Sequence, residues 1–256
     1  MDLVSFGDFG ILRNISVQSL PKAGEFAAVS AEDSSLYGSP VFVPLALSRL
    51  GLETGIIGTL GNDTESASIQ NVLTEGGVDV SEISKKRGKV AQRISVSDGS
   101  QTFTLMHPGT GSDLQIGDVN LDLINTSNYL FFGGAADEKQ LWLQKQLISG
   151  LDNTVLAFNL DEYADRGLEE LRAIFQSVYI AFTTEETLTG LTGQDLDGAA
   201  KMLMDEGCRL LAILLTDGGA TIINDALSVL VEAEAEITAT MELPFGASIA
   251  AVARKT

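Results

Sequence analysis

The chain has 256 residues, of which 45% are hydrophobic and 20% charged, and this balance excludes a disordered or fibrous protein. Its formal net charge of −19 disfavours nucleic acid and anionic membrane surfaces as partners. No apolar run reaches the roughly 18 residues that a membrane span needs, and the N-terminal sequence MDLVSFGDFG lacks the basic start of a signal peptide. We therefore predict a cytoplasmic protein.

The first predicted strand, LVSFG, runs into Gly7-Asp8-Phe9-Gly10. In an open α/β sheet, the carboxyl end of a strand faces the crevice in which ligands bind. Asp8 is therefore a candidate ligand-binding residue. The alternative is an aspartate that only caps a loop.

Two stretches alternate apolar and polar residues instead of following a helical period. The first covers residues 11–36 around the turn LPKAGE, and the second covers residues 88–106 around Asp98-Gly99. An Asp-Gly pair between alternating runs is typical of a β-hairpin. We expect the two stretches to pair into a small sheet beside the main domain, as a lid or a dimer surface.

Between these stretches, residues 45–80 indicate a helix, a strand and a second helix. Leu45, Leu47 and Leu50 supply an apolar helix face that Gly51 can end. A strand follows at residues 54–60. A polar turn at residues 61–64 can then cap a helix whose apolar face contains Ile69, Val72 and Leu73.

From residue 129 onward, strands and helices alternate, which indicates one large α/β domain over residues 1–256 with the lid strands inserted in it. The helix at residues 139–148 is predicted to turn Trp142 and Leu143 inward, with Trp142 as core rather than as a stacking platform. An acidic helix begins at Thr183-Thr184-Glu185-Glu186. The apolar strand LLAILLT ends in the glycine turn 216–220, which suits the approach of a phosphate, and a β-meander follows.

Cysteine and histidine occur once each. A single cysteine, Cys208, excludes an intrachain disulfide and agrees with a reducing compartment. Its apolar setting favours a small buried side chain over a catalytic thiol. His107 follows the second lid stretch, and we expect it at the surface, with a contact to substrate as the alternative.

The order of elements and several local motifs resemble the ribokinase-like, or phosphofructokinase-B (PfkB), carbohydrate kinase family. The most specific match lies in residues 45–80, where Leu50-Gly51 leads to a Gly-x-x-Gly-x-Asp turn at residues 58–63 and then to Gly77-Val78-Asp79. The lid segment 20–25, Glu186 and the turn 216–220 support the match. The resemblance covers nearly the whole chain.

The resemblance implies a three-layer α/β/α sandwich with a small β-sheet lid, and transfer of the ATP γ-phosphoryl group to a hydroxymethyl group of a sugar. That chemistry needs an aspartate base, a glycine-rich helix start and Mg²⁺ on the phosphates. The roles that the family pattern assigns to this chain are Asp8 and Gly38 for the sugar-like substrate, Thr216, Gly218 and Gly219 for the nucleotide, Glu186 for Mg²⁺ through the nucleotide, and Gly246 for the anion hole.

This sequence departs from the family pattern at catalytic positions. Ala247 stands where the family has its aspartate base, and Pro244 replaces a glycine whose N–H would face the anion. Phe42 occupies the position of a sugar-binding asparagine, and Leu12 that of the second acidic residue in the N-terminal pattern. The chain also stops nine residues after Ala247, where the family usually continues with helices that wall the adenine pocket.

Three hypotheses follow from these departures. The first is a sugar kinase homologue with weak or lost phosphoryl transfer. The second is a non-catalytic ligand-binding or scaffold protein, for which a homodimer through the lid strands is one arrangement. The third is an active kinase whose base is another acid, with Asp217 or Glu242 as the nearest candidates. Mg²⁺ is expected to bind only together with nucleotide, because one glutamate does not provide an octahedral site.

Overall fold

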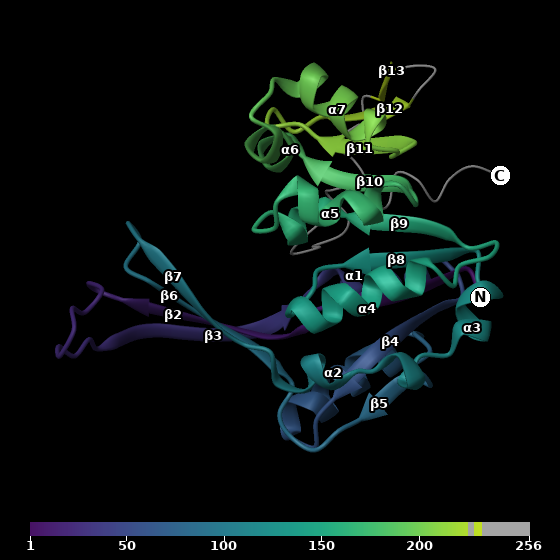
Figure 1. The fold of residues 1–256 in the computed structure, drawn as a ribbon. Helices are drawn as coiled ribbons and strands as arrows, with labels where there is room; N and C mark the ends of the chain where they lie inside the picture. The colour runs from purple at the N-terminus through teal and green to yellow at the C-terminus, as the bar shows by residue number, and fades with distance from the viewer. Residues whose placement is uncertain (225–227, 232–256) are drawn as a thin grey trace.

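The computed structural model of the protein describes residues 1–224 and 228–231. Within these residues, the larger sheet has nine strands in the order β13-β12-β11-β10-β9-β8-β1-β4-β5 (Figure 1). Their bounds are β1 (Leu3–Gly7), β4 (Thr54–Leu60), β5 (Ile83–Lys85), β8 (Tyr129–Gly133), β9 (Val155–Asn159), β10 (Val178–Thr184), β11 (Leu210–Leu214), β12 (Ala220–Asn224) and β13 (Ser228–Val231).

Across the sheet, β11, β10, β9, β8, β1, β4 and β5 run parallel to one another. Strands β12 and β13 complete the sheet as an antiparallel meander. The chain moves from β1 to β4 and β5 on one side, and from β8 to β11 on the other. Strand β1 therefore lies at the point where the strand order reverses, which is where open α/β sheets bind ligands.

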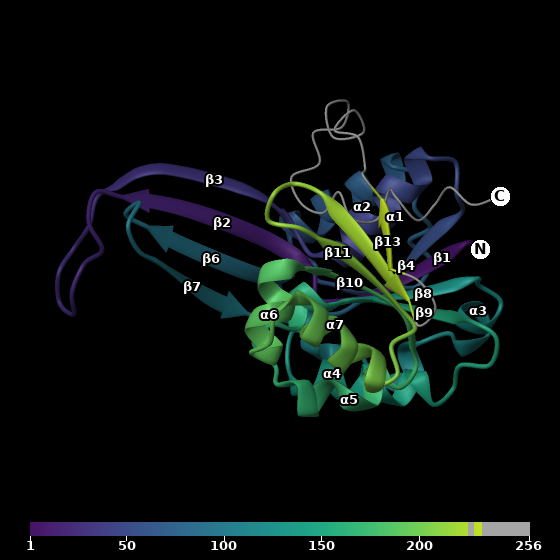
Figure 2. The same cartoon turned by 90° about the horizontal axis from the view of Figure 1, so that it is seen from above.

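Helices cover both faces of this sheet (Figure 2), so the predicted three-layer arrangement is confirmed. Helices α1 (Ser39–Arg49) and α2 (Thr64–Glu75) lie on one face, and the other helices lie on the opposite face. Their bounds are α3 (Leu121–Asn125), α4 (Glu138–Ile148), α5 (Leu168–Phe175), α6 (Glu185–Thr192) and α7 (Leu196–Asp205), with 3₁₀ turns η1 (Gly109–Asp113), η2 (Ile116–Asp118) and η3 (Leu160–Tyr163).

Alternation along the central strands explains why both faces are apolar. Val4 and Phe6 of β1 pack into the core under α3–α7, whereas Leu3 packs with Val43 and Leu47 of α1 on the other side. Successive side chains of a strand point to opposite faces, so a strand buried on both faces is apolar at most positions, and the buried Ser5 of β1 donates its hydroxyl to the carbonyl of Pro40.

The two predicted β stretches form one sheet, in the order β3-β2-β6-β7. Its strands are β2 (Gly10–Val17), β3 (Val29–Tyr37), β6 (Ala91–Ser97) and β7 (Thr102–His107). We call it the lid sheet; it projects from the body as two hairpins joined by the parallel pair β2 and β6 (Figures 1 and 2). The turn at residues 98–101 joins β6 to β7 in a β-hairpin, which confirms the prediction made from the Asp98-Gly99 pair. Gly99 has a φ of 86°, a conformation that favours glycine.

The structure confirms most expectations for single residues and corrects three. Cys208 is buried and His107 is exposed, as predicted. The prediction that Trp142 lies in the core is wrong, because 56% of it is exposed. Helix α4 instead turns Gln140 and Gln144 inward, where their amides donate to the carbonyls of Gly7 and Gly134, and this rotates Trp142 outward.

Two further apolar residues of the early helices are exposed against expectation. Leu50 lies beyond the end of α1 and is 52% exposed, and Val72 of α2 is 39% exposed. The buried face of α2 is narrower than its sequence suggested, because it consists of Ser66, Ile69 and Leu73 and leaves Val72 at its margin. In the described part of the chain, no helix has both the length and the apolar character needed to cross a membrane.

Candidate active site

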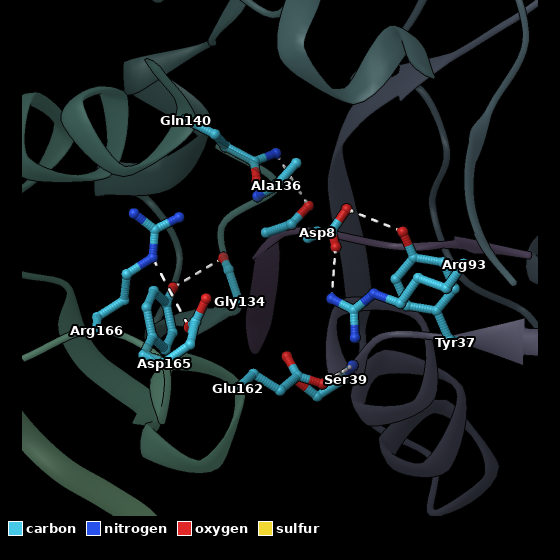
Figure 3. Close-up of polar contacts among 12 residues, drawn as sticks. Asp8, Tyr37, Ser39, Arg93, Gly134, Ala136, Gln140, Glu162, Asp165 and Arg166 are labelled. Carbon is cyan, nitrogen blue, oxygen red and sulfur yellow. Dashed lines mark hydrogen bonds and ion pairs between the residues drawn. The ribbon is translucent and has the colours of Figure 1, made fainter. Parts of the chain in front are cut away.

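Five polar side chains meet at the carboxyl ends of β1 and β8, where the lid sheet joins the body (Figure 3). Asp8 follows β1, Tyr37 ends β3, Ser39 begins α1, Arg93 lies on β6, and Glu162 lies in η3. We call these five residues the polar cluster. They come from segments that are distant in sequence, and the strand-order reversal at β1 brings them together.

Both oxygens of the Asp8 carboxylate accept hydrogen bonds inside the cluster. The Tyr37 hydroxyl donates to Oδ1 over 3.1 Å, and Nη2 of Arg93 donates to Oδ2 over 2.7 Å. Asp8 itself is only 3% exposed. Because an uncompensated buried carboxylate is costly, these two donors replace the water contacts that Asp8 loses in this position.

Arg93 is held from two sides. Its guanidinium carbon lies 4.2 Å from the centre of the Tyr37 ring, in a cation–π contact, while its nitrogen pairs with Asp8. Burial is the largest single influence and lowers the pKa of Arg93, but Asp8, Tyr37 and Glu162 together outweigh it and raise that pKa above its ordinary value. Burial and then Asp8 likewise raise the pKa of Tyr37 far above its ordinary value, so Tyr37 remains a proton donor.

Glu162 binds the first turn of α1. Its carboxylate accepts the backbone N–H of Ser39 over 2.8 Å and the Ser39 hydroxyl over 2.7 Å. A carboxylate is stabilised at a helix N-terminus, where backbone N–H groups have no partner within the helix. Burial is nevertheless the largest influence and raises the pKa of Glu162 above its ordinary value, while the bonds from Ser39 partly offset it.

Two glycines make this close approach possible. Gly38 precedes α1 at φ 102°, and a Cβ there would collide with the carbonyl oxygen of Asp8. A Cβ at Gly133 would collide with the Ser39 hydroxyl and lie 3.0 Å from Glu162 Oε2. The sequence singled out Gly38 as a substrate-side residue; the structure shows that its backbone brings α1 against Asp8.

One donor in the cluster has no partner. Nε of Arg93 is shielded from solvent and makes no hydrogen bond within the described residues. Figure 3 shows the guanidinium between Asp8 and the Ser39–Glu162 pair, so this donor lies inside the cluster. A buried N–H without an acceptor is unfavourable, and an oxygen of a bound molecule would satisfy it.

The predicted nucleotide turn lies between β11 and β12. Its N–H groups are largely engaged: Thr216 donates through both its N–H and its hydroxyl to Glu185, Gly218 donates to the carbonyl of Leu215, and Gly219 donates to Asp217. Two carboxylates therefore occupy the donors that a phosphate would use.

The predicted metal-side residue, Glu186, is exposed at the start of α6. Within residues 1–224 and 228–231, no group of three or more His, Cys, Asp or Glu side chains could hold a metal ion. Gly246 and Ala247 lie outside the described residues, as do Glu242 and Pro244. The structure thus brings Asp8 and Gly38 together, and it places Glu186 and Thr216 at a different pair of strands.

Sequence reasoning missed Tyr37, Ser39, Arg93 and Glu162. Arg93 had a signal that could have found it: it is the sole charged residue of β6 and shares a strand face with the buried Ala91. Glu162 had none, because η3 is too short to show a period. Its neighbour Asp161 makes different contacts and accepts three hydrogen bonds from Thr183 and Thr184 at the start of α6.

The three-layer sandwich, its lid sheet and a polar cluster at the carboxyl end of β1 together define a ribokinase-like protein. Residues 14–239 match the model of the pfkB family carbohydrate kinases, and the chain belongs to that family. Among solved structures, it is similar to ribokinase from Thermotoga maritima, with a TM-score of 0.76, 15% identity, and coverage of 90% of this chain and 77% of that one.

The chain is also similar to Arabidopsis thaliana ribokinase complexed with ribose and ATP, with a TM-score of 0.77, 14% identity, and coverage of 90% of this chain and 77% of that one. Among curated proteins, 5-dehydro-2-deoxygluconokinase of Clostridium perfringens is 27% identical over 207 residues, or 73% of this chain. The chain spans 61% of that relative's length. Fructokinase-2 of Solanum lycopersicum is 26% identical over 237 residues, which cover 85% of this chain and 70% of that protein.

Proposed function

We propose that this sugar kinase homologue binds a sugar-like molecule at the polar cluster and transfers phosphate to it weakly or not at all. The observation that carries the proposal is the contrast between the two halves of the site. The substrate side keeps a buried Asp8 and an unsatisfied Arg93 donor, whereas the donors of the nucleotide turn are bonded to the chain's own carboxylates.

On the substrate side, the ligand would be a polyhydroxylated molecule with an oxygen that accepts from Nε of Arg93. Asp8 has no donor to offer, but each of its carboxylate oxygens accepts a single side-chain hydrogen bond and keeps a second lone pair that could accept from a ligand hydroxyl. The names of two relatives, a fructokinase and a 5-dehydro-2-deoxygluconokinase, give the first compounds to try.

On the nucleotide side, ATP and Mg²⁺ would have to displace internal bonds. Bound Mg²⁺ would neutralise charge on the transferring phosphoryl group. Glu186 is the one family metal-side residue in the described part of the chain, and it is exposed there. Loss of a general base typically costs about 10² to 10⁴ in rate, which is why Ala247 at the family base position supports weak or lost transfer.

Calorimetry with Mg-ATP at millimolar concentration is the first test. Detectable binding, with sugar-dependent ADP release that Ala247→Asp raises by at least roughly tenfold, would support the kinase reading. Ala247→Asn is the matched control, because asparagine is similar in size to aspartate but cannot accept the proton. No nucleotide binding would overturn both kinase readings, and tight Mg²⁺ binding without nucleotide would contradict the metal assignment.

A variant of Asp217 tests the third hypothesis, in which the protein is an active kinase that uses Asp217 as its base. Asp217 is exposed and accepts the N–H of Gly219. Asp217→Asn should leave any residual ADP release unchanged if the proposal is right. A loss of about 10² or more would indicate that Asp217 acts as the base.

A second candidate function is a non-catalytic scaffold that dimerises through the lid sheet. It rests on exposed apolar side chains of that sheet, namely Val29 at 56%, Phe103 at 43%, Leu105 at 57% and Met106 at 59% exposure. Exposed apolar side chains gathered on one sheet are typical of an interaction surface. If the protein sediments as a dimer and Leu105→Asp makes it a monomer, while Val72→Asp on α2 does not, this candidate is supported.

A further inference from the structure

A pocket lies beside α4, and it is lined by residues other than those of the polar cluster. It is a cavity of about 870 Å³ bounded by α4, by the turn after β5 and by the segment between η1 and η2. None of the five cluster residues lines it. Its volume lies within the range of about 300–1,000 Å³ that small-molecule sites occupy. We call it the α4 pocket.

One wall of the α4 pocket is aromatic. Trp142, the single tryptophan of the chain, lines it with 56% of its surface exposed. Ile116, 43% exposed, and the buried Leu143 line the same cavity. An indole left half in water beside apolar neighbours offers a flat surface on which a planar ring can stack.

The rim of the pocket carries three cations in a chain whose net charge is −19. Lys86 is paired with Asp118 over 2.8 Å. Arg87 and Lys139 make no side-chain hydrogen bond or ion pair with any described residue, although the chain has 35 carboxylate side chains. Two unpaired cations beside one cavity can hold an anionic group.

Carboxylates in the pocket limit how much negative charge it accepts. Glu138 is engaged in an ion pair with Arg166, which leaves Asp113 as the unpaired carboxylate of the lining. Two free cations against one free carboxylate match a single phosphate better than a polyphosphate chain.

A buried hydroxyl in the lining lacks a partner. Oγ of Ser112 is shielded from solvent and makes no hydrogen bond within the described residues. An unsatisfied buried hydroxyl is unfavourable, so a ligand oxygen would remove this cost once a local side-chain movement gives it access to Oγ.

We propose that the α4 pocket binds a small ligand that joins a planar ring to one phosphate, as a nucleoside monophosphate does. The ring stacks on Trp142, the phosphate binds Arg87 and Lys139, and Ser112 bonds a ligand oxygen. This site is independent of the sugar and nucleotide sites of the proposed kinase homologue, and it needs no phosphoryl transfer.

The fluorescence of Trp142 reports on this pocket directly, because the chain has no other tryptophan. The full chain is titrated with AMP, GMP, CMP and UMP, with the matching nucleosides, and with ribose 5-phosphate. We expect a saturable fluorescence change with at least one monophosphate, and roughly tenfold weaker binding for its nucleoside and for ribose 5-phosphate, since each lacks one of the two anchors.

Variants separate the proposed contacts from a general effect. Arg87→Ala and Lys139→Ala should each weaken binding roughly tenfold, while Lys145→Ala on the same helix should leave it unchanged. Trp142→Phe, followed by calorimetry, should keep more affinity than Trp142→Ala. These residues are on the surface, so circular dichroism can verify that each variant is folded.

Three results would overturn the proposal. One is the absence of any saturable fluorescence change with all four monophosphates at millimolar concentration. Another is a change that persists in the Arg87→Ala/Lys139→Ala double variant. The third is calorimetric binding of a monophosphate without a fluorescence change, which would place that ligand elsewhere in the protein, for example at the nucleotide turn.

Discussion

The Asp8 carboxylate and the Arg93 guanidinium, 85 residues apart in the chain, form an ion pair of 2.7 Å. This pair ties the lid sheet to the carboxyl end of β1 in the main sheet. Arg93 reaches Asp8 from β6, so the pair fixes how the lid sheet is placed over the carboxyl end of β1. The side chain of Asp8 is 2% exposed and that of Arg93 is 32% exposed. The pair is therefore both a structural tie and a feature that any ligand of the cluster must meet.

Arg93→Ala should destabilise the protein by about 3 kcal/mol, the lower end of the cost of breaking a buried pair, because Arg93 keeps part of its surface in water. Denaturant unfolding measures the loss. Arg13→Ala is the matched control: Arg13 also lies in the lid sheet and pairs with Glu65 over 2.8 Å, but both side chains are more exposed, so the cost should stay below about 1 kcal/mol.

Adding Asp8→Asn to Arg93→Ala should recover part of the lost stability, since the buried charge that Arg93 neutralised is then absent. Equal losses for the Arg13 and Arg93 variants would contradict the special role of the pair, as would a double variant less stable than Arg93→Ala.

The Glu162→Gln variant tests the raised pKa of that carboxyl. A raised pKa means that the native state holds the proton more tightly than the unfolded chain. The stabilisation is full below the ordinary pKa of 4.5 and is lost as the pH rises through the raised pKa. Glutamine resembles the protonated form, so Glu162→Gln should gain stability relative to the wild type as the pH rises from about 4 to 7.

Thermal unfolding at a series of pH values measures this trend, and Glu186→Gln is the control, because Glu186 is exposed. Any constant offset between Glu162→Gln and the wild type reflects the bond to Ser39 that an amide cannot accept. A stability difference that does not change with pH would show that the Glu162 pKa is ordinary.

The sequence predicted the fold well where the apolar period is regular. The strand at residues 54–60 was placed at its observed bounds, and both lid hairpins were found from their alternation. The polar cluster was hard to predict, because its members meet only after β1, the lid sheet and η3 have been assembled. Trp142 shows a second reason why sequence-based prediction fails. The rotation of helix α4 is set by the hydrogen bonds of Gln140 and Gln144 to backbone carbonyls, and the spacing of apolar residues does not predict these bonds.

The most specific family motif has a structural explanation in Asp63. Its Oδ1 accepts the N–H of Ser66 and caps α2, while Oδ2 accepts the N–H of Val90 beside the lid. Asp63→Ala should therefore cost about 1 kcal/mol, as cap removal does. Asp63→Asn should keep most of the stability, because asparagine caps as well as aspartate, and denaturant unfolding at neutral pH compares the two.

Acid should separate the Asp63 variants further. Burial opposes the charged form, but the bonds from Ser66 and Val90 outweigh it and lower the pKa of Asp63. The stabilisation is present above the ordinary pKa of 3.8 and is lost as the pH falls through the lowered value, so the advantage of the wild type over Asp63→Asn should shrink in acid. A constant advantage down to the acid transition would mean that the carboxylate charge does not matter at this cap.

Glu185→Ala tests whether the chain's own carboxylate keeps ATP out of the nucleotide turn. Glu185 accepts both donors of Thr216, over 3.0 and 3.1 Å, and these are donors that the proposed nucleotide site would offer to a phosphate. Its removal frees these donors and takes away a repelling charge, so the affinity for Mg-ATP should rise roughly tenfold, or about 1.4 kcal/mol. Calorimetry measures the affinity, and Glu186→Ala, one residue along the same helix, should not strengthen binding. An unchanged or weaker affinity in Glu185→Ala would show that Glu185 supports the turn and does not block it.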